Sequence, residues 1–410
     1  MNTCTVDPCR ASDQEEPFWG FDVSRFLGKP FLWSAGATSA LVFAGLWLDD
    51  GRGADERLTS HAFLDYHVDV PHEGSALEYS LRSALQWLNR HQHAEGLWSA
   101  RSFGQLCEGD GCGGGGSDQH DVGATALAVV AILEAGPTGA RFEESARKGL
   151  AWLADQQGLD GCFGPSSGKF MYGHALSTLA FARACSILGD EEFRPRAVRG
   201  ARFLKQARNT GYAWRYGIRD GENDTSVTAW AGAALLACAE PEIGVVLEPR
   251  IFDGIRRSLA QSTSDWTHET SYRRAGTSDA DEGYERNEGL TAMAVWLRLR
   301  MGADRSAPEV RGAARRLGWS LPCWNETGSS VDFAAWFAGT RALALYGDAE
   351  LWDAWSGNAR RILLSHQRKY ADGCGCGSWD PVDRWGREGG RVYATAMNAL
   401  TLSMLSARRP

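Results

Sequence analysis

A recurring period is the feature that most constrains what this chain can fold into. Apolar segments rich in Ala, Leu and Thr return six times at successive offsets of 51, 52, 62, 46 and 59 residues, each after a Gly-rich or polar loop. Periods of this length are typical of stacked supersecondary units. The segments are DVGATALAVVAIL from Asp121, YGHALSTLAFARA from Tyr172, DTSVTAWAGAALLA from Asp224, RNEGLTAMAVWLRL from Arg286, DFAAWFAGTRALAL from Asp332 and RVYATAMNALTLSML from Arg391.

Between these segments lie amphipathic stretches such as ALEYSLRSALQWLNRHQ and ESARKGLAWLADQQ, with apolar residues at i, i+3 and i+4. Each period therefore predicts two helices. The Ala-rich helices are apolar nearly all round and belong inside, while the amphipathic ones can cover them. An open solenoid needs polar capping repeats, and the last period ends in an apolar run, so we expect a closed ring. The fold class expected is all-α, with six helix pairs over residues 76–410.

Composition agrees with this pattern. The 410 residues include 17 Trp and 48 Gly, as expected for many turns that are each followed by a large aromatic anchor. The formal net charge is -8 and no basic run is present. Because binding to nucleic acid requires clustered Lys and Arg, we expect no nucleic-acid partner.

Two turns carry a more specific motif. Residues 84–98 read Ala-x-x-Trp-Leu-x-x-x-Gln-x-x-x-Gly-x-Trp, and residues 148–163 read Lys-Gly-x-x-Trp-Leu-x-x-x-Gln-x-x-x-Gly-x-Phe. Weaker copies lie at Arg199–Leu204 with Trp214, and at Leu363–Gln367. Gln near a helix end can hold the next turn while Trp packs over that end. The motif resembles the Gln-Trp repeat of the squalene cyclase and protein prenyltransferase superfamily, which implies an (α/α)6 toroid.

The resemblance also implies what a cyclase of this kind needs. Class II terpene cyclases protonate their substrate with the middle Asp of Asp-x-Asp-Asp-Thr-Ala, and the matching segment here is Asp121-Val122-Gly123-Ala124-Thr125-Ala126. Gly123 cannot donate a proton, so protonation-initiated cyclisation by this route is not expected. We expect Gly123 at the start of an inner helix, facing the axis of the ring.

Protein prenyltransferases place zinc ligands at the starts of neighbouring inner helices. The resemblance therefore implies a possible zinc site with Asp121 and His174 as catalytic groups, and the Asp160–Phe163 turn resembles the Asp-x-Cys element of that site through Cys162. The alternative is that these side chains cap helices or hold rim hydrogen bonds. The expected ligands are His120, Asp121, His174 and Asp224.

Aromatic residues at loops and helix starts predict a cavity for a hydrophobic, isoprenoid-like small molecule, with core packing as the alternative role. Metal-assisted prenyl transfer, a non-catalytic binding or scaffold toroid, and a carbohydrate-active (α/α) barrel all stay open as functions. The expected cavity residues are Trp214, Tyr216, Trp230, Tyr284, Trp336 and Tyr393.

The N-terminal region differs from the repeats. We divide it into a polar tail at 1–28, a membrane-anchor helix at 29–50 and a linker at 51–75. Residues 31–48 are 18 uncharged residues with Arg25 and Lys29 before them and two Asp after them. This arrangement predicts membrane attachment with the toroid on the non-cytoplasmic side. A buried helix in a cytoplasmic soluble protein is the alternative.

The ten cysteines suggest one covalent link. In an oxidising compartment, Cys107 and Cys112 would form a disulfide across a Gly-rich loop. Cys374 and Cys376 are too close in sequence to pair without strain and lack Cys-x-x-Cys spacing.

Overall fold

The computed structural model describes residues 76–107, 111–274, 288–325 and 327–407. Every regular element in these residues is helical, and their only β-type pairing is two isolated bridges. This confirms the all-α prediction. The expected tail, membrane-anchor helix and linker at 1–75 lie outside the described residues and stay predictions.

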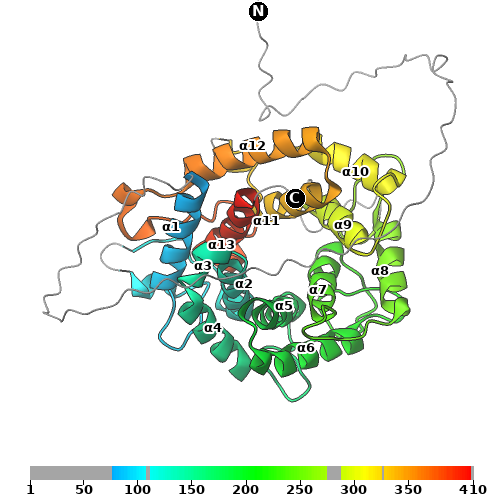
Figure 1. Cartoon of the computed structure of the whole chain (residues 1–410), viewed down its shortest axis with the longest axis horizontal. Helices are drawn as coiled ribbons and strands as arrows, with labels where there is room; N and C mark the ends of the chain where they lie inside the picture. Colours follow the sequence, from blue (N-terminus) through cyan, green and yellow to red (C-terminus); the bar gives the residue numbers. More distant parts are fainter. Residues whose placement is uncertain (1–75, 108–110, 275–287, 326, 408–410) are drawn as a thin grey trace, which may run out of the picture. The chain divides into compact units, whose positions relative to one another are not determined.

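An inner ring of helices surrounds the centre of Figure 1. Each of these helices contacts the next in chain order, and the last, α13, contacts the first, α2. The ring is therefore closed, as expected from the absence of polar capping repeats. The inner helices are α2 (Asp121–Leu133), α5 (Phe170–Leu188), α7 (Thr225–Cys238), α9 (Glu288–Arg300), α11 (Phe333–Tyr346) and α13 (Gly386–Ser406).

A second layer of helices lies outside this ring (Figure 1). In the chain each outer helix after the first follows the inner helix against which it packs, as α4 follows α2 and α6 follows α5. The outer helices are α1 (Ala76–Arg90), α4 (Glu143–Asp155), α6 (Arg194–Ala207), α8 (Pro249–Ser262), α10 (Pro308–Trp319) and α12 (Ala349–His366). Short connecting elements are η1 (Phe103–Leu106), η2 (Asp118–His120), α3 (Gly136–Ala140), η3 (Glu191–Phe193) and η5 (Tyr370–Gly375).

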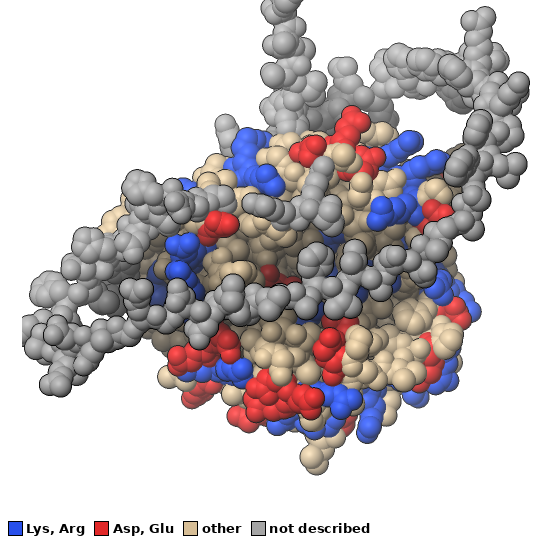
Figure 2. All heavy atoms as spheres, in the orientation of Figure 1, with Lys and Arg blue, Asp and Glu red and all other residues tan. Residues whose placement is uncertain are grey.

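Burial follows the two helix types that the sequence distinguishes. In α2 every residue from Ala124 to Leu133 is buried, whereas α8 buries one face, including Ile251, Ile255 and Leu259. Apolar residues on all sides suit an inner helix, and a single apolar stripe suits an outer one. Figure 2 shows Lys and Arg interspersed with Asp and Glu over the visible face of the described residues.

The first helix closes the ring. Outer helix α1 packs mainly against inner helix α13, so the beginning and end of the described chain form one pair. Gln367, just after α12, donates from its amide nitrogen to the Ser80 carbonyl oxygen at 2.8 Å and accepts from the Ser80 hydroxyl at 2.7 Å. We call the junction between residues 76–107 and 111–116 on one side and residues 367–391 on the other the seam.

The Gln-Trp turns have the bonding that their sequence predicts. Gln92 donates to the carbonyl oxygen of Gly96 in its own turn at 2.7 Å and to that of Ser145 on the next outer helix at 2.9 Å. Trp98 donates from its indole nitrogen to the Leu88 carbonyl oxygen at 2.7 Å, near the end of α1. Gly96 has a φ of 100°, and a Cβ there would collide with the Lys148 carbonyl, so this turn requires glycine.

Among the described helices, none is long and apolar enough to cross a membrane.

Candidate functional site

A cavity of about 830 Å³ lies among the N-terminal halves of the inner helices and the loops that precede them. Its volume falls in the range of small-molecule sites, roughly 300–1,000 Å³. Eight of its 27 described lining residues are aromatic. They are Phe163, Phe170, Tyr172, Tyr216, Trp230, Tyr272, Trp385 and Tyr393, and aliphatic partners include Val122, Leu127, Leu176, Met293 and Met397.

Small residues in the first turns of α2 and α5 leave space for this cavity. Gly123 and Gly173 both line it and face each other, and a Cβ on Gly123 would lie 3.6 Å from the Gly173 Cα atom. Gly123 therefore sits near the start of an inner helix and faces the interior of the ring, as predicted. No carboxyl group stands at this position of the wall.

Tyr393 is held by a buried acid behind the cavity wall. Its hydroxyl donates to Asp383 Oδ2 at 2.9 Å, and the same oxygen accepts from the Phe333 backbone nitrogen at 3.1 Å. Burial raises the pKa of Asp383 to about 7, and the neighbouring Asp332 carboxylate acts in the same direction. Asp383 is therefore protonated more readily than an exposed aspartic acid. Sequence analysis missed Asp383, because no motif marks it.

A second tyrosine is fixed by a hydrogen-bonded chain. The hydroxyls of Tyr172 and Ser226 are 2.6 Å apart, and Ser226 also donates to Asp224 Oδ1 at 2.6 Å. Burial raises the pKa of Tyr172 well above its ordinary value, so it stays a neutral phenol. Together, Tyr172 and Tyr393 place two oriented hydroxyls in an otherwise largely apolar wall.

The structure does not bring the four expected zinc ligands together. Their ligand atoms form no converging group in the described residues, although all four are described. His174 accepts from the Phe163 backbone nitrogen at Nδ1 and donates to the Gly200 carbonyl oxygen at Nε2, so both ring nitrogens are engaged. Complete burial lowers the pKa of His174 to about 4, which keeps it neutral.

The remaining members of that set are also engaged locally. Asp121 accepts from the Ala100 backbone nitrogen at 2.8 Å, and Asp224 accepts from the Ser226 and Val227 backbone nitrogens as the N-cap of α7. His120 Nε2 lies 2.7 Å from Glu388 Oε2. These residues do not fit a shared zinc ion, because their ligand atoms satisfy helix ends and loops.

Only some of the aromatic residues expected to line the cavity do so. Tyr216, Trp230 and Tyr393 line the cavity, but Trp214 and Trp336 do not. Trp214 is fully buried and donates to the Leu204 carbonyl oxygen at the end of α6. It therefore caps the C-terminal end of that helix. Trp336 packs in the core with Trp324 and Phe333. Tyr284 lies outside the described residues.

One group with convergent metal-ligand atoms does occur in the described part of the chain. It consists of His91, Cys107, Cys112 and Cys374, at the seam and away from the cavity wall. Cys107 and Cys112 are not joined by the expected disulfide, since their sulfur atoms are 3.3 Å apart and a disulfide requires about 2.05 Å. The cluster could bind a metal ion such as zinc.

No protein-family model matches the chain, and no curated protein is similar to it in sequence. Solved structures share its fold. An alpha-amylase from Clostridium perfringens is 13% identical with a TM-score of 0.54, and the match covers 83% of this chain and 100% of that one.

Two further structural neighbours belong to different enzyme classes. A variant of the type II terpene cyclase MstE from Scytonema, in complex with geranylgeranyl dihydroxybenzoate, is 18% identical with a TM-score of 0.52; the match covers 80% of this chain and 97% of that chain. An inactive variant of the alpha-1,6-mannanase GH76A from Salegentibacter sp. HEL1_6, in complex with alpha-1,6-mannotriose, is 11% identical with a TM-score of 0.52, at 80% and 98% coverage. At these identities the likeness shows the α/α-toroid fold alone.

Proposed function

We propose that this chain is a toroid of six helix pairs that binds an isoprenoid-like or other elongated apolar molecule in its central cavity. The observation that carries the proposal is the composition of the cavity wall. Eight aromatic side chains and several aliphatic ones line it, and Glu388 is the only carboxylate among the described lining residues. Burial of apolar surface against such a wall is the main source of affinity.

The same wall argues against acid-initiated chemistry. Gly123 leaves the cyclase acid position without a carboxyl group, and Asp383 is separated from the cavity by Tyr393. A tyrosine of raised pKa is a poor acid toward an alkene. The two phenols suit a different task, which is to accept a hydrogen bond from a hydroxyl group of the bound molecule, because each donates its own proton within the protein.

A carbohydrate is the second candidate ligand, because two of the structural neighbours are an amylase and a mannanase. Aromatic rings also stack on sugars. Glycosidases, however, normally need two carboxyl groups flanking the scissile bond, about 5–10 Å apart, and the described wall offers one. The third candidate, a scaffold that binds no ligand, does not account for the open cavity.

The test is a binding titration of the full chain with geranylgeraniol, and separately with alpha-1,6-mannotriose and maltotriose. Trp230 and Trp385 line the cavity, so intrinsic fluorescence reports occupancy and calorimetry checks it. We expect saturable binding of the prenyl alcohol and none of the sugars. Sugar binding without prenyl binding would establish the carbohydrate alternative.

A pair of matched variants locates the binding. Gly123→Phe places a ring in the cavity from a Cβ position with only ordinary contacts, and Gly357→Phe makes the same change at an exposed position of outer helix α12, where a Cβ meets nothing within 4 Å. We expect Gly123→Phe to weaken geranylgeraniol binding at least tenfold, about 1.4 kcal/mol, and Gly357→Phe to leave it unchanged. Equal affinities in the two variants would place the ligand elsewhere.

A further inference from the structure

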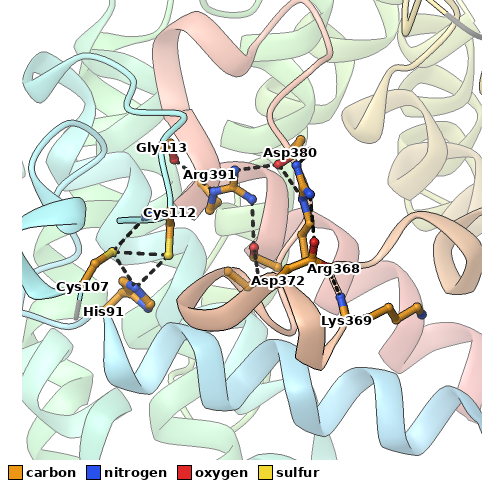
Figure 3. A network of polar contacts seen from close by, with 11 residues as sticks. His91, Cys107, Cys112, Gly113, Arg368, Lys369, Asp372, Asp380 and Arg391 are labelled. Carbon is orange, nitrogen blue, oxygen red and sulfur yellow. Dashed lines mark hydrogen bonds and ion pairs between the residues drawn. The ribbon is translucent and has the colours of Figure 1, made fainter. Parts of the chain in front are cut away.

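The His/Cys cluster joins segments from opposite ends of the described chain. His91 follows α1 directly, Cys107 follows η1, Cys112 lies in the Gly-rich loop, and Cys374 belongs to η5 near the C-terminus. Figure 3 shows His91, Cys107 and Cys112 pointing toward one another beside Arg391. His91 and Cys374 are 283 residues apart in sequence.

The interatomic distances suit one tetrahedral ion. His91 Nε2 lies 3.3 Å from the sulfur of each of the three cysteines, the Cys107 and Cys112 sulfurs are 3.3 Å apart, and all four ligand atoms lie within 4.8 Å of one another. Zinc bonds of about 2.3 Å to sulfur and 2.0–2.1 Å to nitrogen give tetrahedral edges of roughly 3.6–3.8 Å. The four separations of 3.3 Å must widen by about 0.3–0.5 Å to admit the ion, and the Cys374 sulfur lies within about 1 Å of its tetrahedral distance from the other two sulfurs.

The surroundings of the ligands are already arranged for metal binding. The Trp87 carbonyl oxygen lies 2.8 Å from His91 Nδ1 and accepts its proton, which leaves the lone pair of Nε2 directed at the sulfurs. The imidazole stacks on Trp87 with ring centroids 4.2 Å apart. The Cys112 backbone nitrogen donates to the Cys107 sulfur at 3.2 Å, a contact that favours a thiolate.

We propose that His91, Cys107, Cys112 and Cys374 bind one structural Zn²⁺ that fastens α1 to the C-terminal end of the ring. Four protein ligands leave no open position for water or substrate, which distinguishes a structural site from a catalytic one. Binding releases three thiol protons to solvent, so the ion and its three thiolates carry a net charge of -1. The guanidinium of Arg391 donates to the Gly113 carbonyl oxygen at 3.0 Å, next to Cys112, and is also paired with Asp380 Oδ1 at 2.6 Å.

The site lies where the two ends of the described chain meet, so a metal ion there would stabilise the closed ring. Helix α1 is the outer partner of α13, yet the whole ring separates the two in sequence. Arg90 donates to the Cys376 carbonyl oxygen at 3.1 Å, and the Arg391 backbone nitrogen donates to Gly114 at 2.8 Å. A bound ion adds four strong bonds to these contacts and holds the long loop closed.

The test is the metal content of the full chain, purified without chelators or a metal-affinity tag and measured by plasma mass spectrometry. We expect about one zinc per chain in the wild type and in Cys376→Ser, and loss of stoichiometric zinc in Cys374→Ser. Cys376 is the matched control, because it lies two residues away and is also half-buried but is outside the cluster. Equal zinc in the two variants would overturn the proposal.

A second measurement does not depend on how the variants fold. Wild-type protein stripped of metal and refilled with Co²⁺ should show thiolate-to-cobalt charge-transfer bands and the intense visible bands of tetrahedral cobalt. Chelation should also make the segment around α1 more sensitive to limited proteolysis, and zinc should reverse this. A reduced wild-type protein that neither contains nor takes up zinc or cobalt would refute the site, and stoichiometric iron would refute the choice of metal. Neither result bears on ligand binding in the cavity.

Discussion

The cavity wall and the seam use polar side chains in opposite ways. Around the cavity, Asp224 and His174 bond to nearby backbone groups at the starts of α7 and α5, and His120 is the exception because it contacts Glu388 across 268 residues. At the seam, His91 and Cys374 approach each other from 283 residues apart. Most polar groups at the cavity therefore leave a largely apolar surface for a ligand, whereas the cluster at the seam joins distant parts of the chain.

The same contrast applies to the Gln-Trp turns. Gln157 bridges its own turn and the next outer helix by donating to Gly161 and Arg196, and Gln367 makes the equivalent bridge to Gly377 and Ser80. The first bridge joins neighbours in the chain, but the second joins its two ends. Equivalent side chains should therefore differ in their effect on ring closure.

Replacement of a turn tryptophan should have the largest effect on stability. Trp214 in mid-ring and Trp379 at the seam are both fully buried and donate to the end of an outer helix, at Leu204 and Leu363. Trp214→Ala and Trp379→Ala should each lower the free energy of unfolding by about 3–5 kcal/mol in urea titrations. Only Trp379→Ala should also weaken zinc retention. Equal zinc retention in both variants would remove the distinction between the seam and the other turns.

The titration of Asp383, behind the cavity wall, should make the free energy of unfolding depend on pH. Its folded pKa of about 7 exceeds the ordinary value of 3.8 for an aspartic acid, so the folded state binds more protons than the unfolded state between these pH values. The contribution of Asp383 to the free energy of unfolding is fully present below about pH 4. It is lost as pH rises through 7, and it amounts to at most about 4 kcal/mol. The charged and titratable groups around it are Asp332, Arg384 and Tyr393.

Asp383→Asn should abolish the contribution of this carboxyl group to the pH dependence of the unfolding free energy. Urea titrations at pH 5 and pH 8 measure it, and the difference in unfolding free energy between the two pH values should be smaller in the variant than in the wild type. An unchanged difference would mean that Asp383 titrates normally. Zinc content at a fixed pH should be the same in both proteins, because this change lies at the cavity and not in the cluster.

The glutamine bridges should give the smallest effect. Gln157→Ala and Gln367→Ala each remove two donated hydrogen bonds and should cost about 1–3 kcal/mol. Gln367→Ala should in addition expose α1 to limited proteolysis, because it releases the Ser80 contact. Similar proteolysis of α1 in the two variants would show that other seam contacts are sufficient to hold that helix.

Much of the fold was predictable because its signals are local. The apolar segment at Asp121 and the amphipathic one at Ala76 show their roles within a few turns of helix. Gln92, Gly96 and Trp98 bond within one turn and the helices beside it. The position of Gly123 also followed from the alignment of one short segment with a family motif.

The candidate sites were less predictable. Ligand-type residues at helix starts, such as Asp121 and Asp224, could equally be caps, and bonding to the backbone decided this. Cys374 lacks the spacing of a metal pair with Cys376, so its role depended on Cys107 and Cys112, which lie far away in sequence. Asp383 became notable only through its burial behind Tyr393.

By itself the sequence determined the helix pairs, the turns that join them and the absence of an acid at Gly123, because each depends on residues within about one repeat. Only the tertiary structure decided that α1 pairs with α13, that the aromatic wall encloses an open cavity and that His91 meets three cysteines. The sequence predicts that the ring closes, but which side chains closure brings together depends on contacts between residues hundreds of positions apart, and these have no local signature in the chain.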